Sequence, residues 1–103
     1  VQIGGVQWNV HSMGRGDFLR IHNDDLRNRQ FAFVLYLSPA WNETYGGTLH
    51  LVDGTRTIQI EPRYNSLVVF DVTHGIRHFV ETIRPSAEHR RRISFGGWLL
   101  RPS

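Results

Sequence analysis

The sequence predicts an all-β protein, a sandwich or barrel of about eight short strands. Apolar residues recur with a period of two along nearly the whole chain, which is the spacing of residues on one face of a strand. Turn residues, chiefly Gly, Pro, Asn and Asp, interrupt this pattern at near-regular intervals. Only the stretch 24–30 is a candidate for a helical turn. A length of 103 residues is that of one domain.

The expected strands follow from the pattern in chain order. In 6–10, Val6, Trp8 and Val10 alternate with polar residues, and in 19–21, Leu19 and Ile21 share one face. The apolar run 31–37 has no helix caps and is short enough for a strand buried on both faces. The remaining strands are expected at 48–52, 57–61, 66–71, 78–83 and 92–100. The polar stretch 84–91 is expected to be a solvated hairpin loop.

Composition excludes several classes of function. The chain has no Cys, which removes disulfide scaffolds, thiolate metal sites and Cys nucleophiles. All twelve basic residues are Arg, so Schiff-base and P-loop lysines are absent. The pI is near 10.2, but a net charge of +3 indicates a mildly basic surface rather than nucleic-acid binding. No apolar run approaches the roughly 20 residues of a membrane helix and no signal peptide is visible, so we expect a cytoplasmic protein that makes no membrane contact.

His22 and Asp24 stand two residues apart on a predicted strand, so their side chains share one face. An imidazole and a carboxylate placed in this way can bind one metal ion. A further His would complete the two-His-one-carboxylate set that leaves three positions open on Fe(II). The pair alone is a weak signal, because a chain with six His can produce it by chance. The candidates for the third ligand are His50, His74, His78 and His89.

Arg92 and Ser94 share a face of the last predicted strand. A guanidinium and a hydroxyl in this arrangement suit a carboxylate. His78 opens the preceding strand, so a metal set ending at His78 would stand next to an anion-binding pair. Such a combination is typical of a site for an anionic co-substrate.

These motifs, in this order, resemble the catalytic core of the Fe(II)/2-oxoglutarate-dependent oxygenases, in the branch similar to prolyl 4-hydroxylases. The resemblance runs from Val6 to Leu100 and is carried by the segments 16–24, 33–41, 43–51, 60–70, 78–81 and 92–98. It implies a double-stranded β-helix, that is, a jelly roll, with iron between two sheets. It also implies that residues 1–103 form a single catalytic core.

The resemblance implies a role for each matching residue. It assigns His22, Asp24 and His78 to iron as the catalytic centre, and Arg92 to the distal carboxylate of 2-oxoglutarate. Further implied co-substrate contacts are the hydroxyl of Tyr36, a hydrogen bond from Ser94 and the apolar side chain of Leu49. Packing alone explains Tyr36 equally well, and it would also explain Trp98, which matches a Trp near the pocket in the family.

The sequence departs from the family's pattern in three ways. The family often has a Tyr near the co-substrate on its first core strand, and the stretch 10–13 has none, so we expect His11 or Ser12 to take that role. The gap between the distal His and the Arg is long, which we attribute to the turn 84–91. The family's N-terminal supporting helices are missing, which would expose one sheet face for a homodimer to cover.

The resemblance implies that 2-oxoglutarate is converted with O₂ to succinate and CO₂ while an unactivated C–H bond is hydroxylated, with ascorbate as a candidate reductant. The expected substrate is a prolyl residue of a peptide or protein, selected by the segments 14–17, 24–30 and 41–45. Free proline or another amino acid is nearly as well supported. A non-catalytic jelly-roll binding module is the competing class, against which the complete ligand set argues. The nucleobase-demethylating branch needs base-stacking loops and an extra Arg, which the segment 92–98 lacks.

Overall fold

Eight strands and two short 3-10 helices make up the structure, a computed structural model that describes residues 1–26 and 28–103. All eight strands expected from the apolar pattern are present, with ends that differ by up to three residues. The elements are β1 (Gly5–Met13), β2 (Leu19–Asn23), β3 (Arg29–Tyr36), η1 (Glu43–Tyr45), β4 (Leu49–Asp53), β5 (Arg56–Ile60), β6 (Leu67–Asp71), β7 (Arg77–Val80), η2 (Pro85–Ala87) and β8 (Arg92–Leu100).

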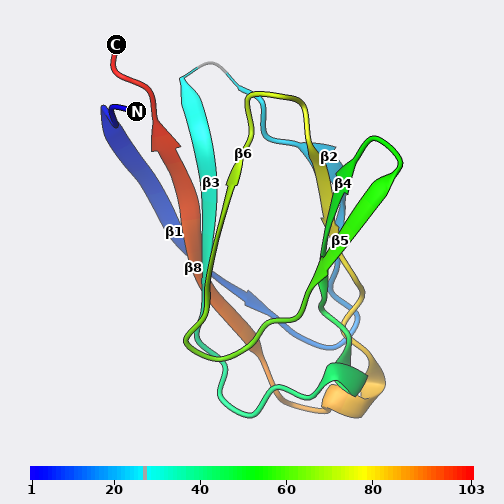
Figure 1. Cartoon of the computed structure of the whole chain (residues 1–103). Coiled ribbons are helices and arrows are strands. Elements are labelled where there is room, and N and C mark those ends of the chain that lie inside the picture. Colours follow the sequence, from blue (N-terminus) through cyan, green and yellow to red (C-terminus); the bar gives the residue numbers. More distant parts are fainter. Residues whose placement is uncertain (27) are drawn as a thin grey trace.

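The strands form two four-stranded antiparallel sheets that stand opposite each other (Figure 1). The strand order is β1-β8-β3-β6 in the first sheet and β2-β7-β4-β5 in the second. The chain therefore crosses repeatedly between the sheets, which is the connectivity of a jelly roll. The all-β jelly roll expected from the sequence and the resemblance is confirmed.

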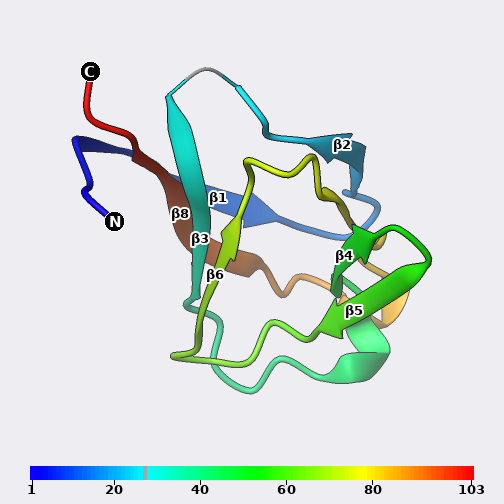
Figure 2. The same cartoon turned by 45° about the horizontal axis from the view of Figure 1, so that its top comes forward.

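The two ends of the sandwich differ. At one end η1 and η2 lie side by side, and at the other the two chain termini lie close together beside β1 and β8 (Figure 2). The backbone N–H of Gly4 donates to the carbonyl of Leu100 there, over 2.8 Å. Neither 3-10 helix, nor any other helix in the described part of the chain, is long and apolar enough to cross a membrane.

Two loop predictions are wrong. Among the described residues of 24–30 there is no helix: two tight turns, closed by Leu26 N–H to the Asp24 carbonyl and Arg29 N–H to the Leu26 carbonyl, lead straight into β3. Arg27, which that prediction included, lies outside the described residues. The stretch 84–91 is solvated as expected except at Ala87, which is buried where η2 packs on η1. It is not a hairpin, because it joins β7 of the second sheet to β8 of the first.

The core between the sheets is small, and one sheet face is open. Leu49, Leu51 and Val80 form the buried cluster, with Met13 and Phe70 among the residues packed against it. Outside, the first sheet presents apolar side chains of β1 and β6 that are at least half exposed, namely Val6, Trp8, Val10, Leu67 and Val69. The strand 31–37 was expected to be buried on both faces. Most of β3 is only half-buried, because nothing in the described chain covers this outer face.

Candidate metal and co-substrate site

A cavity of about 490 Å³ lies between the two sheets. Its volume is within the range of sites that hold small ligands. The second sheet contributes His22, Asp24 and His78 to its wall, and the first sheet contributes Arg92 and Ser94. The residues that the sequence analysis singled out from distant motifs therefore meet in one cavity.

The two imidazoles and the carboxylate converge on a single point. β2 and β7 are antiparallel, and their register places His22 directly opposite His78, while Asp24 follows β2 by one residue. The Nε2 atom of His22 lies 3.3 Å from Asp24 Oδ1, and that of His78 lies 3.2 Å from Asp24 Oδ2. All three donor atoms lie within 4.8 Å of one another, so they fit the facial two-His-one-carboxylate set that suits Fe(II).

A β-bulge aims His22 into the cavity. The register between β2 and β7 shifts between Leu19 and His22, so both side chains reach the cavity although an unbroken strand would send them to opposite faces. The sequence analysis placed Leu19 with Ile21 on one face. The bulge separates them, and Ile21 is left 48% exposed.

Contacts behind the two rings hold them in place. His22 Nδ1 lies 2.6 Å from the carbonyl oxygen of Arg20, and donation to that oxygen leaves Nε2 free to ligate. The His78 ring is buried and packs edge-on against Phe70, with centroids 5.3 Å apart. Its Nδ1 has no hydrogen-bond partner among the described residues, so the ring is oriented by this packing and by the contact of Nε2 with Asp24.

The Asp24 side chain is held as a carboxylate. Burial disfavours its charge, but a hydrogen bond and positive charge from His78 outweigh that, with smaller contributions from His22 and Trp98, so the pKa of Asp24 lies below its ordinary value. The buried indole N–H of Trp98 lies near enough to Asp24 to lower its pKa slightly. Among the described residues, however, this N–H has no hydrogen-bond partner. An ionised carboxylate is the form that a metal requires.

Arg92 is a buried cation that no acid neutralises within the described chain. Its side chain is 3% exposed. Nε donates to the carbonyl of Gly47 over 2.8 Å, while Nη1 lies 3.6 Å from Met13 Sδ and Nη2 lies 3.5 Å from the Tyr36 hydroxyl. Because a buried charge without a counter-charge is costly, this arrangement favours binding of an anion from outside the chain.

Gly47 makes room for this guanidinium. Its φ of +75° is strained for any residue with a side chain, and a Cβ there would lie 2.7 Å from Ile83 Cδ1 and 3.0 Å from Arg92 Cδ. Burial raises the pKa of the nearby Tyr36 hydroxyl, so this group stays protonated beside Arg92 and is available as a donor.

The other implied co-substrate residues lie near Arg92. Tyr36 does not line the cavity: it is fully buried, contacts Arg92 and is paired with Ser94 across β3 and β8. Ser94 and Leu49 are buried and line the cavity. Trp98 lines it four residues after Ser94 on β8, toward the chain termini.

The structure decides between the two candidates for the missing Tyr. Ser12 lies away from the cavity, where its hydroxyl accepts a hydrogen bond from Arg91 Nε over 3.0 Å, so the expectation for Ser12 is wrong. His11 lines the cavity. Met13 lines it too and contacts Arg92, which sequence reasoning missed because the two residues are brought together only by the pairing of β1 with β8.

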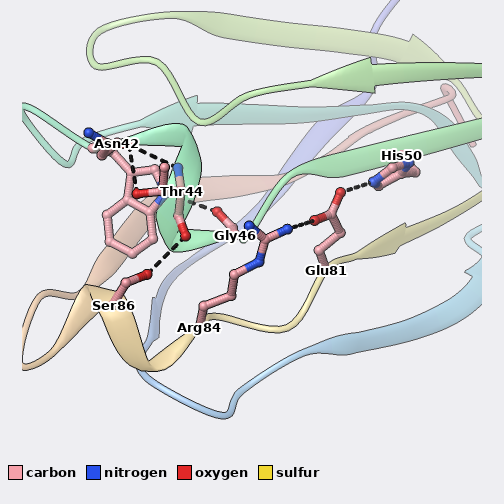
Figure 3. Close-up of polar contacts among 8 residues, drawn as sticks. Asn42, Thr44, Gly46, His50, Glu81, Arg84 and Ser86 are labelled. Carbon is pink, nitrogen blue, oxygen red and sulfur yellow. Dashed lines mark hydrogen bonds and ion pairs between the residues drawn. The ribbon is translucent and has the colours of Figure 1, made fainter.

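Of the remaining His residues, none lines the cavity. His50 is a buried residue of β4 whose ring stacks on Phe79 and is hydrogen-bonded to Glu81. Glu81 also pairs with Arg84 at 3.8 Å (Figure 3). His74 is exposed in the turn after β6, and His89 is exposed after η2. These positions leave His78 as the third member of the cluster.

Arg29 is a further cavity residue, within the segment 24–30 that was expected to select the substrate, but its contacts were not predicted. Its guanidinium lies 3.5 Å above the ring of Trp98, and its Nη1 is 3.9 Å from Asp24 Oδ1. Of the three segments expected to select substrate, 14–17 and 24–30 reach the cavity through Asp17, Asp24 and Arg29. The segment 41–45 does not line it, because η1 packs against η2 instead.

Comparison with known proteins now identifies the family. Residues 8–100 match the 2OG-Fe(II) oxygenase superfamily. The chain belongs to this family. Fe(II), 2-oxoglutarate and O₂ are therefore the cofactor and co-substrates of its chemistry. The convergent His-Asp-His donors suit Fe(II), and the unneutralised Arg92 suits a dicarboxylate, so the described residues fit both groups.

Similar proteins of this oxygenase family are prolyl hydroxylases. The chain is 37% identical over 94 residues to prolyl 3-hydroxylase OGFOD1 of Mus musculus, covering 84% of this chain and 17% of that protein. It is 31% identical over 106 residues to prolyl 3,4-dihydroxylase OGFOD1 of Ostreococcus tauri, covering 92% of this chain and 20% of that protein. The chain thus spans about a fifth of the length of these relatives.

Among solved structures, a prolyl-4-hydroxylase of Pseudomonas putida superposes with a TM-score of 0.84 at 27% identity, over 98% of this chain and 54% of that one. A prolyl hydroxylase of Trichoplax adhaerens, solved with a peptide fragment of hypoxia inducible factor, superposes with a TM-score of 0.81 at 24% identity. The match covers 95% of this chain and 45% of that one, and supports the shared oxygenase fold.

Proposed function

We propose that this chain is an Fe(II)- and 2-oxoglutarate-dependent dioxygenase core that hydroxylates a prolyl residue of a peptide or protein, with residues 1–103 as one catalytic unit. The observation that carries the proposal is the meeting of a His-Asp-His cluster and a buried, unneutralised Arg92 in one cavity. Identity of 37% to a prolyl 3-hydroxylase supports the choice of substrate.

In this proposal each wall of the cavity has a separate task. His22, Asp24 and His78 hold Fe(II), and the bound metal supplies the oxidising chemistry, with release of succinate and CO₂. Arg92 pairs with the distal carboxylate of 2-oxoglutarate, with donors from Tyr36 and Ser94 beside it. Leu49 provides an apolar wall that excludes water from the same end.

The substrate is proposed to enter at the opposite end, where Arg29 lies on Trp98. The prolyl ring would pack beside the Arg29–Trp98 pair, whose guanidinium covers one face of the indole at 3.5 Å. Packing of the substrate against this wall would bring the target carbon close to the metal site. The positive charge of Arg29, which lies 3.9 Å from Asp24 Oδ1, would favour an acidic or carboxylate-bearing substrate.

The experiment incubates the chain with Fe(II), 2-oxoglutarate and ascorbate, and offers a Pro-rich peptide, free L-proline and a methylated oligonucleotide in parallel. Mass spectrometry looks for one added oxygen, with the Arg92→Ala variant as control. Oxidation of the peptide alone supports the proposal. Oxidation of free proline alone moves the function to amino-acid metabolism, and oxidation of the oligonucleotide alone overturns it. Absence of both product and succinate would favour a non-catalytic binding module.

We also propose that a second copy covers the open outer face of the first sheet, giving a homodimer. Support comes from the exposed apolar side chains that β1 and β6 present on that face, because exposed apolar surface of this kind marks interaction sites. An isologous dimer needs only one such patch, used by both copies. Cytoplasmic location stays a prediction from the sequence, which fractionation of cells would check.

A further inference from the structure

A second, smaller cavity of about 240 Å³ lies at the end of the sandwich that carries η1, away from the chain termini (Figure 1). Two segments form it: residues 40–43, which lead from β3 into η1, and the turn 61–64, between β5 and β6. Among the described residues, it shares no lining residue with the cavity between the sheets. Pockets for small-molecule ligands span roughly 300–1,000 Å³, so this smaller cavity suits a single side chain of a partner.

Trp41, Pro62 and Tyr64 provide the apolar walls of this cavity. Pro62 is buried and Trp41 is half-buried, whereas Tyr64 is 56% exposed. The indole of Trp41 is held in place, because its Nε1 donates to the carbonyl of Gly46 over 3.0 Å and its ring packs edge-on against Tyr45 with centroids 5.2 Å apart. An aromatic ring that is already ordered loses little conformational entropy when a ligand packs on it.

Backbone hydrogen bonds hold the turn that carries Tyr64. The N–H of Asn65 donates to the carbonyl of Tyr36 over 2.8 Å, and the N–H of Tyr36 donates to the carbonyl of Ser66 over 3.0 Å. The backbone N–H and the hydroxyl of Ser66 both donate to the carbonyl of Arg63. The turn is therefore attached to the end of β3, the same strand that leads into the opposite wall of the cavity.

Glu43 and Glu61 place two carboxylates at this cavity, and both residues are exposed. Within the described part of the chain, the glutamates that form ion pairs are Glu81 and Glu88, so the charges of Glu43 and Glu61 are not neutralised. Arg63 also lines the cavity, but it is exposed and pairs with neither of these two carboxylates among the described residues. The cavity thus combines aromatic surface with negative charge.

A guanidinium complements both features. It is planar and stacks on aromatic rings, and its five N–H donors bond to carboxylates. A Lys ammonium is more strongly hydrated and has no flat face to stack. We propose that this cavity binds an Arg side chain from an exposed segment of a partner protein. The guanidinium packs on Tyr64 and Trp41 and pairs with Glu43 or Glu61.

The test is titration of the isotope-labelled chain with the peptide acetyl-Gly-Arg-Gly-amide, followed by amide and indole NMR signals. The matched probe is acetyl-Gly-citrulline-Gly-amide, which keeps the shape of Arg without its charge. We expect the Arg peptide to shift the Trp41 indole signal and the backbone signals of 61–64 in a saturable way. The Kd of the citrulline peptide should be about threefold to thirtyfold higher, because both the cation–π contact and the ion pair are lost.

Two variants separate the aromatic contribution from the ionic one. Tyr64→Leu keeps an apolar side chain but removes the ring, and Glu61→Gln keeps the size but removes the charge. Each should raise the Kd of the Arg peptide about twofold to fivefold. Glu88→Gln makes the same change of charge at an exposed residue after η2, so it is the matched control and should leave the Kd unchanged. Unchanged NMR signals elsewhere in the chain show that the variants are folded.

Three outcomes would overturn the inference. Equal binding of the Arg and citrulline peptides would mean that the cavity recognises shape without charge. An equal loss in Glu61→Gln and Glu88→Gln would mean that overall charge, rather than this cavity, attracts the peptide. Absence of saturable shifts at 40–43 and 61–64 would show that the cavity takes no such ligand. The inference does not depend on the proposed function, which the oxidation assay tests separately.

Discussion

His22 and His78 are cross-strand neighbours whose ring centroids lie 4.1 Å apart at an interplanar angle of 58°. The antiparallel register of β2 and β7 produces this approach, and Asp24 then bridges both Nε2 atoms. Two ligands therefore depend on one strand pairing, so the metal site is as rigid as the second sheet that carries it.

Loss of one ligand should abolish metal binding. We expect His78→Ala to weaken Fe(II) or Mn(II) affinity by more than about 100-fold, beyond the 10–100-fold typical of losing a residue that only supports a ligand. Equilibrium dialysis of the metal measures this, and His74→Ala is the control. Should His74→Ala lose the metal while His78→Ala keeps it, the assignment of the third ligand is wrong.

Removal of the Arg92 guanidinium should weaken 2-oxoglutarate binding by about 2–5 kcal/mol, the usual effect of breaking a buried charge pair. Arg90→Ala and Arg91→Ala are controls of equal charge. Arg90 is exposed beside Tyr45, and Arg91 is bonded to Ser12 outside the cavity. Calorimetry on the metal-loaded variants measures the Kd. An equal loss in all three variants would indicate a diffuse basic patch instead of a specific anchor.

A side chain added at position 47 should disturb the end of the cavity at which 2-oxoglutarate is proposed to bind. Gly47→Ala adds a Cβ against Ile83 and Arg92 at a positive φ, whereas Gly54→Ala adds one at a φ of +61° with no atom within 4 Å. Both substitutions incur backbone strain of about 1 kcal/mol or more. Only Gly47→Ala should also raise the Kd for 2-oxoglutarate. Melting temperatures and calorimetry separate the two effects, and equal behaviour of both variants would contradict this account.

Acid should selectively weaken the turn that leads from β6 toward β7. Hydrogen bonds from the Thr73 hydroxyl and backbone N–H hold the pKa of Asp71 below its ordinary value. A lowered folded-state pKa means that the stabilisation is complete above the unfolded pKa of about 3.9 and is lost as pH falls through the folded value. Asp71→Asn should therefore be less stable than the parent at pH 7, with the gap closing below about pH 4. Urea unfolding at both pH values tests this.

A charged residue introduced on the open outer face of the first sheet should dissociate the proposed dimer. Trp8→Glu places a carboxylate among apolar side chains that a second copy would cover, so we expect a monomer where the parent is a dimer. Light scattering coupled to size exclusion measures the mass. Arg56→Glu, on an exposed strand of the other sheet, is the control and should leave the parent's mass unchanged. A parent chain that is monomeric at high concentration would end the proposal.

Local apolar patterns were enough to predict all eight strands: alternation with a period of two for most of them, and a short continuous apolar run for 31–37. Loop structure was less accessible. The stretch 84–91 is polar in sequence, yet Ala87 is buried by η1, an element distant in the chain, and no local pattern encodes that packing.

The same limit applies to the site. Spacing of two residues placed His22 with Asp24 and Arg92 with Ser94, although Asp24 lies one residue beyond the end of β2. From the residues alone four His stayed open as the third ligand; the family resemblance implied His78, and the pairing of β2 with β7 brings His78 to the cluster. The contacts of Arg29 with Trp98 and of Met13 with Arg92 cross from one strand to another, so they follow from topology rather than from spacing.

Because the cavity lies between two sheets, ligand binding in it is coupled to the stability of the fold. Under the proposed function, iron would be held by one sheet and the dicarboxylate anchored on the other, so the bound pair would link two layers that share only a small apolar core. Ligands that bind only the folded state add about 2.7 kcal/mol of stability at 100 times their Kd. The lifetime of the chain toward proteases should accordingly increase with the supply of 2-oxoglutarate and iron.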